Sequence, residues 1–446
     1  MTKGETIKLD TLIIGGGIQG LWLLKDLSSK GYSTLLLTKG SLGDGQTLHS
    51  QLRVQGGHSV ANDDRNLIVS CRDVSHGLWS NFLEQHPDVR AMGDSKILFR
   101  WNKYDSDSKE TTSSSWKSFC KNNDLIFFDQ HTDESINLGL IQREDAEGNS
   151  LLFSSDETWL DGRALILALI EDVSDYIRQG LAKIIQGTAN RIDVDEAGNV
   201  RVLAQINDRE YEVEPKTLVL AAGSGNVHIL SQITFYANEA LQNWKSFLNI
   251  PKAQDSLNTY NVIVLRGNLP NLTGFFKLEK EKEKEKGSEI KLNIFSRRDK
   301  NDQIVWLLPI QDDNDDKKIT QKKIKDLRSF LQQLNSPDIL PDRFQWGVYR
   351  GDRVKIEVAD STAQVVARRG NLWVFWPNWL TLAPLASEQI TDEINNFIES
   401  PDPNCNLSNL NFEPYSEVAD EKWQTVDWQN WSDFREIWEI NDENNI

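Results

Sequence analysis

The sequence predicts an α/β fold in which a doubly wound, Rossmann-like domain carries an inserted α+β domain. Three observations lead to this prediction. A strand, a glycine-rich turn, a helix and a second strand follow one another near the N-terminus, and a later buried strand ends in the glycines Gly223 and Gly225. Between about 240 and 350 the pattern changes to alternating strands. The 446 residues are also too many for one ordinary compact domain.

The N-terminal unit is the most sharply defined. Thr11–Ile14 is typical of a buried parallel strand, and the glycine-rich turn Gly15–Gly20 follows at once. Leu21–Ser29 carries apolar residues at helical spacing, Gly31 closes that helix, and Tyr32–Leu37 supplies the next strand. Together these segments predict one βαβ half of a doubly wound sheet.

Further elements follow from the same patterns. An amphipathic helix is predicted over Asp161–Leu181, and the sequence between 184 and 206 indicates two hairpin-forming strands. The predicted strands are Ile184–Val194, Val200–Ile206, Thr217–Ala222, Val262–Leu265, Lys291–Phe295, Ile304–Leu308 and Leu372–Phe375, with a last helix over about 383–399. The polar stretch Thr111–Ser115 is typical of a loop, and the Glu/Lys run Lys277–Lys286 of a solvated loop or exposed helix.

The alternation of patterns predicts a discontinuous organisation. We expect a nucleotide-binding domain assembled from residues 8–90, 150–235 and 350–400, and a substrate domain from 91–149 and 236–349. Residues 401–446 form an acidic tail that contains Trp423, Trp428, Trp431 and Trp438. These tryptophans are expected either to dock on the chain itself or to contact a protein partner.

Composition excludes several classes of function. A net charge of −18 argues against a nucleic-acid partner, because phosphate backbones need clustered basic residues. Cys71, Cys120 and Cys405 form no C-x-x-C pair and the histidines show no metal-ligand spacing, so neither a disulfide framework nor a metal site is expected. The polar N-terminus and the lack of a long apolar run predict a cytoplasmic protein without a transmembrane segment.

The glycine-rich turn carries the clearest chemistry. Gly15 permits the tight turn, Gly17 lets the backbone approach a pyrophosphate, and Gly20 allows the helix to pack closely on the strand. The free amides of the helix N-terminus favour the phosphate charge. We therefore expect a dinucleotide to bind at Gly15, Gly17, Ile18, Gln19 and Gly20.

The end of the second strand departs from the usual pattern. An acidic residue normally binds the ribose hydroxyls there, but this chain has Thr38 and Lys39. Thr38 can still form one hydroxyl hydrogen bond. Lys39 leaves open the alternative that a 2′-phosphate is bound, as in an NADP-dependent reductase domain.

Four segments carry a resemblance to a known family. Thr38–His49 resembles the segment after the second strand in the D-amino-acid-oxidase-like family, which includes glycine oxidase, glycerol-3-phosphate dehydrogenase, and the sarcosine and dimethylglycine dehydrogenases. Asp161–Ile166 is similar to the start of its central helix, Leu218–Gly223 to a strand that ends near the cofactor, and Asn371–Pro384 to its flavin-contacting turn and helix. The resemblance covers about half of the chain.

The resemblance implies FAD as cofactor and hydride transfer from a small amine, amino acid or hydroxy compound. The residues that it places at the cofactor are Thr38, Lys39, Gly45, Gln46, Thr47, His49, Ala222, Gly223, Trp379, Leu380, Thr381 and Leu382. His49 has the spacing of a histidine that is joined covalently to the flavin in the sarcosine and dimethylglycine dehydrogenases. The alternative is a loop histidine that forms hydrogen bonds near the cofactor.

Arg350 lies in Gln345–Arg350, which resembles the segment that delivers an arginine to the substrate carboxylate in glycine and D-amino-acid oxidases. A guanidinium matches a carboxylate bidentately, whereas the alternative is a surface arginine paired with an acid. Gly351 replaces the family's proline, and Trp379 replaces a small residue near the flavin. Trp379, Thr38 and the acidic tail leave open a second function: a catalytically inactive flavin- or nucleotide-binding protein with a partner-binding or regulatory role.

Overall fold

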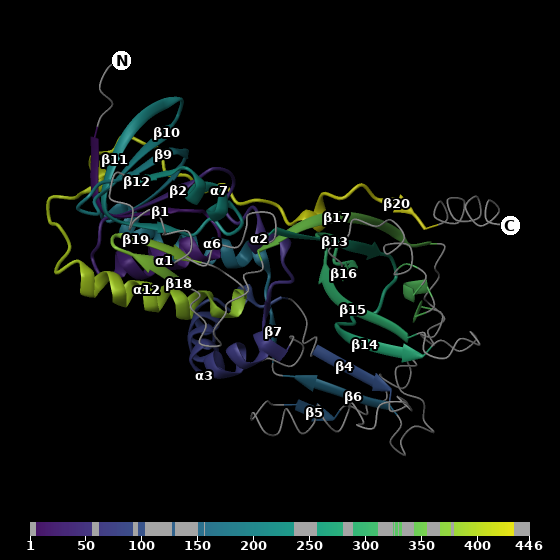
Figure 1. Cartoon of the computed structure of the whole chain (residues 1–446). Coiled ribbons are helices and arrows are strands. Elements are labelled where there is room, and N and C mark those ends of the chain that lie inside the picture. Colours follow the sequence, from purple (N-terminus) through teal and green to yellow (C-terminus); the bar gives the residue numbers. More distant parts are fainter. Residues whose placement is uncertain are drawn as a thin grey trace.

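The computed structural model describes residues 6–55, 62–91, 97–102, 127–129, 150–155, 157–235, 257–279, 289–310, 324, 326–328, 330–331, 343–354, 366–375 and 379–431. Two large sheets lie side by side along the molecule, with α2 between them (Figure 1). The predicted Thr111–Ser115 loop lies outside the described residues.

The first sheet is built around parallel strands. Its order is β12 (Ile233–Phe235), β9 (Thr188–Val194), β10 (Val200–Ile206), β11 (Arg209–Leu220), β1 (Thr6–Ile14), β2 (Thr34–Thr38) and β8 (Ala182–Gln186); β19 (Leu372–Phe375) pairs with β11 and with β18 (Val366–Arg369). β19, β11, β1, β2 and β8 are mutually parallel. Every residue of β2 is buried, as expected for a strand covered on both faces.

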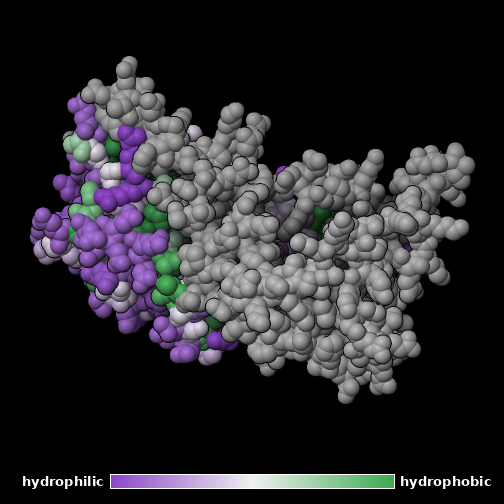
Figure 2. Space-filling view, turned by 60° about the horizontal axis from the view of Figure 1, so that its bottom comes forward, coloured by the Kyte–Doolittle hydropathy of each residue, from purple (hydrophilic) through white to green (hydrophobic). Residues whose placement is uncertain are grey.

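Helices cover one face of this parallel core. They are α1 (Ile18–Ser29), α3 (Asn62–Gln85), α6 (Gly162–Arg178) and α12 (Ala383–Phe397). The short 3₁₀ helix η1 (Pro87–Val89) follows α3, and η4 (Leu380–Leu382) directly precedes α12. Leucines of α1 are fully buried against α6 and α12. Seen from below, the described outer surface here is mostly hydrophilic (Figure 2), which is typical of amphipathic helices that face solvent.

The opposite face packs against antiparallel strands rather than against a full second helix layer. Ile7, Leu12 and Leu35 from the parallel strands share one apolar core with Val202 and Ile206 of β10. The single strand predicted over Ile184–Val194 is wrong, because Gly187 divides it into β8 and β9. A Cβ on Gly187 would lie 2.6 Å from the carbonyl oxygen of Gln205. The chain can therefore pass from β8 to β9 at this place only if residue 187 is glycine. β9 and β10 do form the predicted hairpin, and α7 (Gly225–Ser231) follows β11.

The second sheet is almost wholly antiparallel. Its order is β20 (Gln429–Asn430), β17 (Gln345–Val354), β13 (Leu257–Arg266), β16 (Ile304–Ile310), β15 (Glu289–Arg298), β14 (Gly274–Glu279), β4 (Ile97–Asn102), β6 (Ser150–Ser155) and β5 (Phe127–Asp129). Only β14 and β4 pair in parallel. Alternate residues face two cores: Ile263 and Trp306 pack with Phe330 on one side, whereas Val264 and Phe295 pack with Trp159 on the other.

The sheet boundaries differ from the predicted domain ranges at three places. The second sheet takes in β6 up to Ser155 and β17 up to Val354, beyond the predicted limits at 149 and 349, and it also includes β20 from the tail. The Glu/Lys run begins within β14, and its residues from 280 onward lie outside the described residues. The division of the chain into domains stays a prediction.

The tail runs along both sheets and docks on its own chain as far as residue 431 (Figure 1). The amide of Leu42 donates to the Glu417 carbonyl (2.7 Å), and β20 pairs with β17 at the far end. The side chains of Trp423 and Trp431 are buried in cores of the second sheet. Short 3₁₀ turns, η5 (Leu407–Asn409) and η6 (Lys422–Gln424), lie along this path. Trp438 lies outside the described residues. Among the described helices, none is long and apolar enough to cross a membrane.

Candidate functional site

The glycine-rich turn joins β1 to α1 with almost no free space. Gly15 has a φ of +129°, and its amide donates to the Leu37 carbonyl at 2.9 Å. A Cβ on Gly15 would lie 2.4 Å from the carbonyl oxygen of Ala221, and a Cβ on Gly20 would lie 1.9 Å from the carbonyl oxygen of Gly15. The strands and helix can therefore approach this closely only where both positions are glycine.

The N-terminus of α1 faces a second short helix. Gly17 is the N-cap of α1 and offers no capping side chain. The amide of Ile18 donates to the hydroxyl of Thr47 at 3.1 Å, and a Cβ on Gly17 would lie 3.1 Å from the same oxygen. Thr47 belongs to α2 (Gln46–His49), so α2 closes over the helix end at which a pyrophosphate is favoured.

Thr38 lies beside the same turn. A Cβ on Gly16 would lie 2.5 Å from the Thr38 hydroxyl, which donates to the Gly40 carbonyl at 2.9 Å. With its proton used inside its own turn, this hydroxyl is left to accept a hydrogen bond, as from a ribose O–H. Lys39 is exposed to solvent.

The backbone of α2 begins at a glycine and is held at its C-terminal end by the second sheet. Gly45, its N-cap, has a φ of +116° with open space where a Cβ would lie. His49 is 6% exposed, and its Nε2 lies 3.4 Å from Oδ1 of Asp44. The hydroxyl of Tyr260, from β13, donates to the His49 carbonyl at 2.6 Å. This hydrogen bond joins the second sheet to the segment predicted to lie along the cofactor.

Gly351 explains why the proline of the resembling families is absent. A Cβ at this position would lie 2.7 Å from Cζ and 2.9 Å from the hydroxyl oxygen of Tyr260. The Tyr260 ring therefore lies over Gly351, and its position depends on the lack of a side chain there.

The end of β11 is held by a residue that the sequence patterns did not single out. The amide of Ala222 donates to Oδ1 of Asn226 at 2.8 Å, and Nδ2 of Asn226 donates to the Phe375 carbonyl at 2.8 Å. Asn226 is fully buried and ties the ends of β11 and β19 together. Gly223, with a φ of +57°, follows within reach of α2: a Cβ there would lie 3.9 Å from Oε1 of Gln46. The sequence feature that could have identified this residue is an asparagine at the start of the helix that follows Gly223–Gly225.

The predicted C-terminal turn, Trp379–Leu382, is held from two sides. The amide of Leu382 donates to the Trp379 carbonyl (3.1 Å), which closes the 3₁₀ turn η4. The Thr381 hydroxyl accepts from the amide of Gln55 at 2.7 Å, and the Thr381 carbonyl accepts from Nε1 of Trp79 at 2.9 Å. The structure thus brings the turn against the segment that follows α2. Trp379 and Leu380 are partly exposed.

Arg350 lies on β17 opposite Asn261 and is exposed. Its neighbour Tyr349 faces the buried side of the sheet. Burial raises the pKa of Tyr349; Tyr260 and Glu421 raise it further, and Arg297 opposes the shift. Because successive strand residues face opposite sides, Arg350 projects from the other face. The role of Arg350 stays a prediction.

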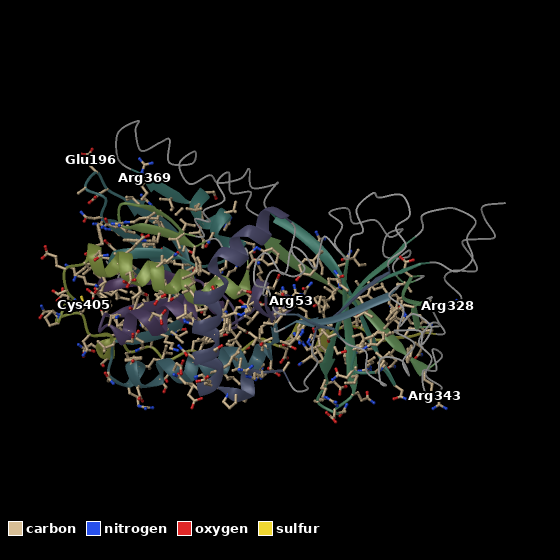
Figure 3. All side chains as sticks on the ribbon, turned by 90° about the horizontal axis from the view of Figure 1, so that it is seen from below. Arg53, Glu196, Arg328, Arg343, Arg369 and Cys405 are labelled. Carbon is tan, nitrogen blue, oxygen red and sulfur yellow. The ribbon has the colours of Figure 1, made fainter. Side chains whose placement is uncertain are left out.

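A buried charged cluster lies where the two sheets and the tail meet. Nη1 of Arg53 lies 3.4 Å from Oε2 of Glu157, with side-chain exposures of 3% and 0%. Nη2 of Arg297 donates to the Gln51 carbonyl at 2.8 Å, and the guanidinium stacks over the Trp159 ring at 5.2 Å. Burial lowers the pKa of both arginines, while Glu157 and Glu421 respectively oppose that shift. Figure 3 shows Arg53 at the middle of the molecule.

A cavity of about 280 Å³ lies away from all of these residues, in the outer helix layer between α1, α3 and α12. Its lining includes Trp22, Asp26, Phe82 and Glu388. The candidate site is instead defined by backbone turns: the glycine-rich turn, α2, the β11 end and η4. The glycines present no side chains at the turn, and the N-terminus of α1 supplies amides where a dinucleotide pyrophosphate would lie, so these residues fit FAD.

Comparison with known proteins identifies the class. The model of the DAO family, the FAD dependent oxidoreductases, matches residues 10–393. The chain belongs to this family, and FAD is its cofactor. The family, fold class and cofactor predicted from the sequence are thereby confirmed.

Individual relatives span nearly the whole chain. A probable FAD-dependent oxidoreductase of Pseudomonas aeruginosa is 26% identical over 433 residues, which cover 93% of this chain and 98% of the relative. A crystal structure of a P. aeruginosa FAD dependent oxidoreductase superposes with a TM-score of 0.62 at 19% identity, covering 94% and 98% of the two chains. Glycine oxidase from Geobacillus kaustophilus gives a TM-score of 0.57 at 13% identity, covering 93% and 100%.

Proposed function

We propose that this FAD-dependent oxidoreductase oxidises a small amine, amino acid or hydroxy compound by hydride transfer to the flavin. One observation carries the proposal: the second sheet is joined by the Tyr260–His49 hydrogen bond to the same short helix, α2, that closes over the N-terminus of α1. A substrate held by the second sheet would therefore meet a cofactor held by the first. When bound, FAD supplies the hydride acceptor.

The residues of the cradle have separable roles in this proposal. The amides at the start of α1, beside Gly15, Gly17, Ile18, Gln19 and Gly20, would bind the pyrophosphate, and Thr38 would accept from a ribose hydroxyl. The segment from Gly45 to His49 would lie along the flavin ring, with Ala222 and Gly223 beside it. The turn Trp379–Leu382 would direct amides at the pyrimidine edge of the ring and stabilise negative charge there.

His49 separates two modes of cofactor attachment. Its ring is buried, and its Nε2 lies 3.4 Å from Oδ1 of Asp44, so the ring can be held beside this carboxylate without a bond to the flavin. We expect acid precipitation to leave yellow flavin in the supernatant. Flavin that stays with the pellet in the natural protein but not in a His49→Ala variant would instead establish a covalent bond at this residue.

Arg350 is proposed to anchor a substrate carboxylate. Replacement by Lys should raise KM for carboxylate-bearing substrates about tenfold or more, while amines without a carboxylate should be oxidised as before. A uniform change across both groups would contradict this role.

The reaction itself is tested by anaerobic mixing of the purified yellow protein with a panel of amines, amino acids and hydroxy acids. Bleaching of the flavin absorbance by one class supports the proposal and names the substrate class, and admission of air then shows whether oxygen is the acceptor. If dithionite bleaches the flavin but no panel compound does so, the proposal fails.

A further inference from the structure

Gln55 is held by hydrogen bonds next to η4 of the candidate site. It directly follows β3 (Arg53–Val54), the short strand after α2. Its amide donates to the Thr381 hydroxyl of η4 at 2.7 Å, and its carbonyl oxygen lies 3.3 Å from Nε2 of His76 on α3. The main chain of Gln55 therefore has little freedom to move relative to the turn Trp379–Leu382.

The side chain of Gln55 is buried but incompletely satisfied. Gln55 is 8% exposed, and its Oε1 has no hydrogen-bond partner among the residues that the structure describes. A buried amide oxygen without a donor is costly, and folded proteins leave few such groups. The amide and the carbonyl oxygen of the same residue are both engaged, so Oε1 is the acceptor of Gln55 that is left for a ligand.

We propose that Oε1 of Gln55 accepts a hydrogen bond from the N–H of the bound flavin ring. The oxidised ring has a single N–H, at position 3 of its pyrimidine portion. That edge is the one assigned to the turn Trp379–Leu382, to which the Gln55 amide is bonded. The inference rests on the proposed placement of the flavin and adds a residue that binds its donor, whereas the amides of the turn can bind only its acceptors.

The Gln55→Leu variant tests this inference, because leucine is of similar size and lacks the acceptor. We expect FAD to bind about tenfold more weakly to the full-length chain, the effect of one net hydrogen bond. Without FAD the variant should unfold at the same temperature as the natural protein or at a higher one, because an unsatisfied buried oxygen has been removed. A glutamine with a purely structural role would instead make the FAD-free variant less stable.

The matched control is Gln179→Leu, at the exposed C-terminal end of α6, which should change neither quantity. Equal FAD affinity of Gln55→Leu and the natural protein would overturn the inference but leave the proposed function intact. A natural protein that binds no FAD would overturn both.

A measurement on the natural protein covers the case in which Gln55→Leu does not fold. With ¹⁵N-labelled FAD, the N3–H resonance should be visible, slow to exchange with solvent, and close enough to the Gln55 side-chain amide protons for a nuclear Overhauser effect. An N3–H that exchanges at the rate of free flavin would refute the hydrogen bond.

Discussion

Both sheets pair segments that are far apart in the sequence, but the first also includes strands of a local unit, residues 6–54, that runs from β1 through the glycine-rich turn to β3. In the first, the turn Gly15–Gly20 and both strands beside it fall within residues 6–38, and the parallel strands are buried on both faces. In the second, β14 pairs with β4 across about 170 residues of chain, and β20 from the tail pairs with β17. The glycine-rich turn and α2 are thus encoded by local sequence, whereas the β11 end and η4 of the candidate site, like β4 and β20 of the second sheet, are contributed by distant segments.

The junction between the sheets combines these two kinds of organisation. Arg53 follows α2 by only a few residues, yet it pairs with Glu157 and lies 5.9 Å from the Trp159 ring, which in turn packs on Phe295 of β15 at 4.8 Å. Arg297, from the same strand as Phe295, reaches back to the Gln51 carbonyl. Charge and aromatic stacking therefore hold the second sheet against the local unit.

The largest expected effect is at this junction. Glu157→Ala should lower the free energy of unfolding by about 3–5 kcal/mol, because it removes the close counter-charge of a buried guanidinium. Urea titration followed by tryptophan fluorescence measures the change. The control is Glu214→Ala on the rim of the first sheet, whose ion pairs with the exposed Lys8 (3.8 Å) and Arg201 (3.7 Å) should together contribute less than about 1 kcal/mol. Equal losses for the two variants would contradict the distinction between junction and rim.

The next effect tests the local unit. Gly20→Ala should destabilise the protein by about 3 kcal/mol and abolish tight FAD binding, because its Cβ would displace the Gly15 carbonyl. FAD content after purification and thermal unfolding report the two consequences. Gly77→Ala provides the control: it lies on α3, a Cβ there would contact nothing within 4 Å, and alanine should be neutral or slightly stabilising. Retention of normal FAD content by Gly20→Ala would show that the turn is not the pyrophosphate site.

The sequence could predict the elements that depend on neighbouring residues, but not the residues that act through distant partners. The strand–turn–helix unit, the β9–β10 hairpin and the strand ending at Gly223 follow from short-range periodicity and glycine placement. Gln55, Asn226 and Tyr260 did not emerge, because each acts through a partner 100 or more residues away: Thr381, Phe375 and His49. Gly187 was missed because the crowding that requires glycine comes from the Gln205 carbonyl of the next strand but one, which only the pairing of the strands reveals.

A smaller effect is expected from Asp26, a carboxylate of α1 in the helix layer over the first sheet. Burial raises the pKa of Asp26 to about 6, although the Ser387 hydroxyl, which donates to it at 2.6 Å, and Lys25 act in the opposite direction. The folded state therefore keeps a proton that the unfolded chain loses near pH 4, so the natural protein should lose stability relative to Asp26→Asn as the pH rises from about 4 to about 6.

At pH 7 the Asp26→Asn variant should be more stable by about 2 kcal/mol, and at pH 4 the two proteins should be equal. Denaturant titrations at both pH values measure this difference. A stability gain that is the same at both pH values would show that ionisation of Asp26 is not its source.

The smallest effect isolates one of the hydrogen bonds by which the second sheet contacts the local unit. Tyr260→Phe removes only the hydroxyl that donates to the His49 carbonyl and should cost about 1 kcal/mol of stability. The ring would still lie over Gly351, so Gly351→Ala should be harmful in both the natural and the Tyr260→Phe backgrounds but much less so in Tyr260→Ala. A double-mutant cycle of unfolding free energies separates the two contributions. If Gly351→Ala is equally harmful in all three backgrounds, the ring does not impose glycine at that position, and the missing proline needs another explanation.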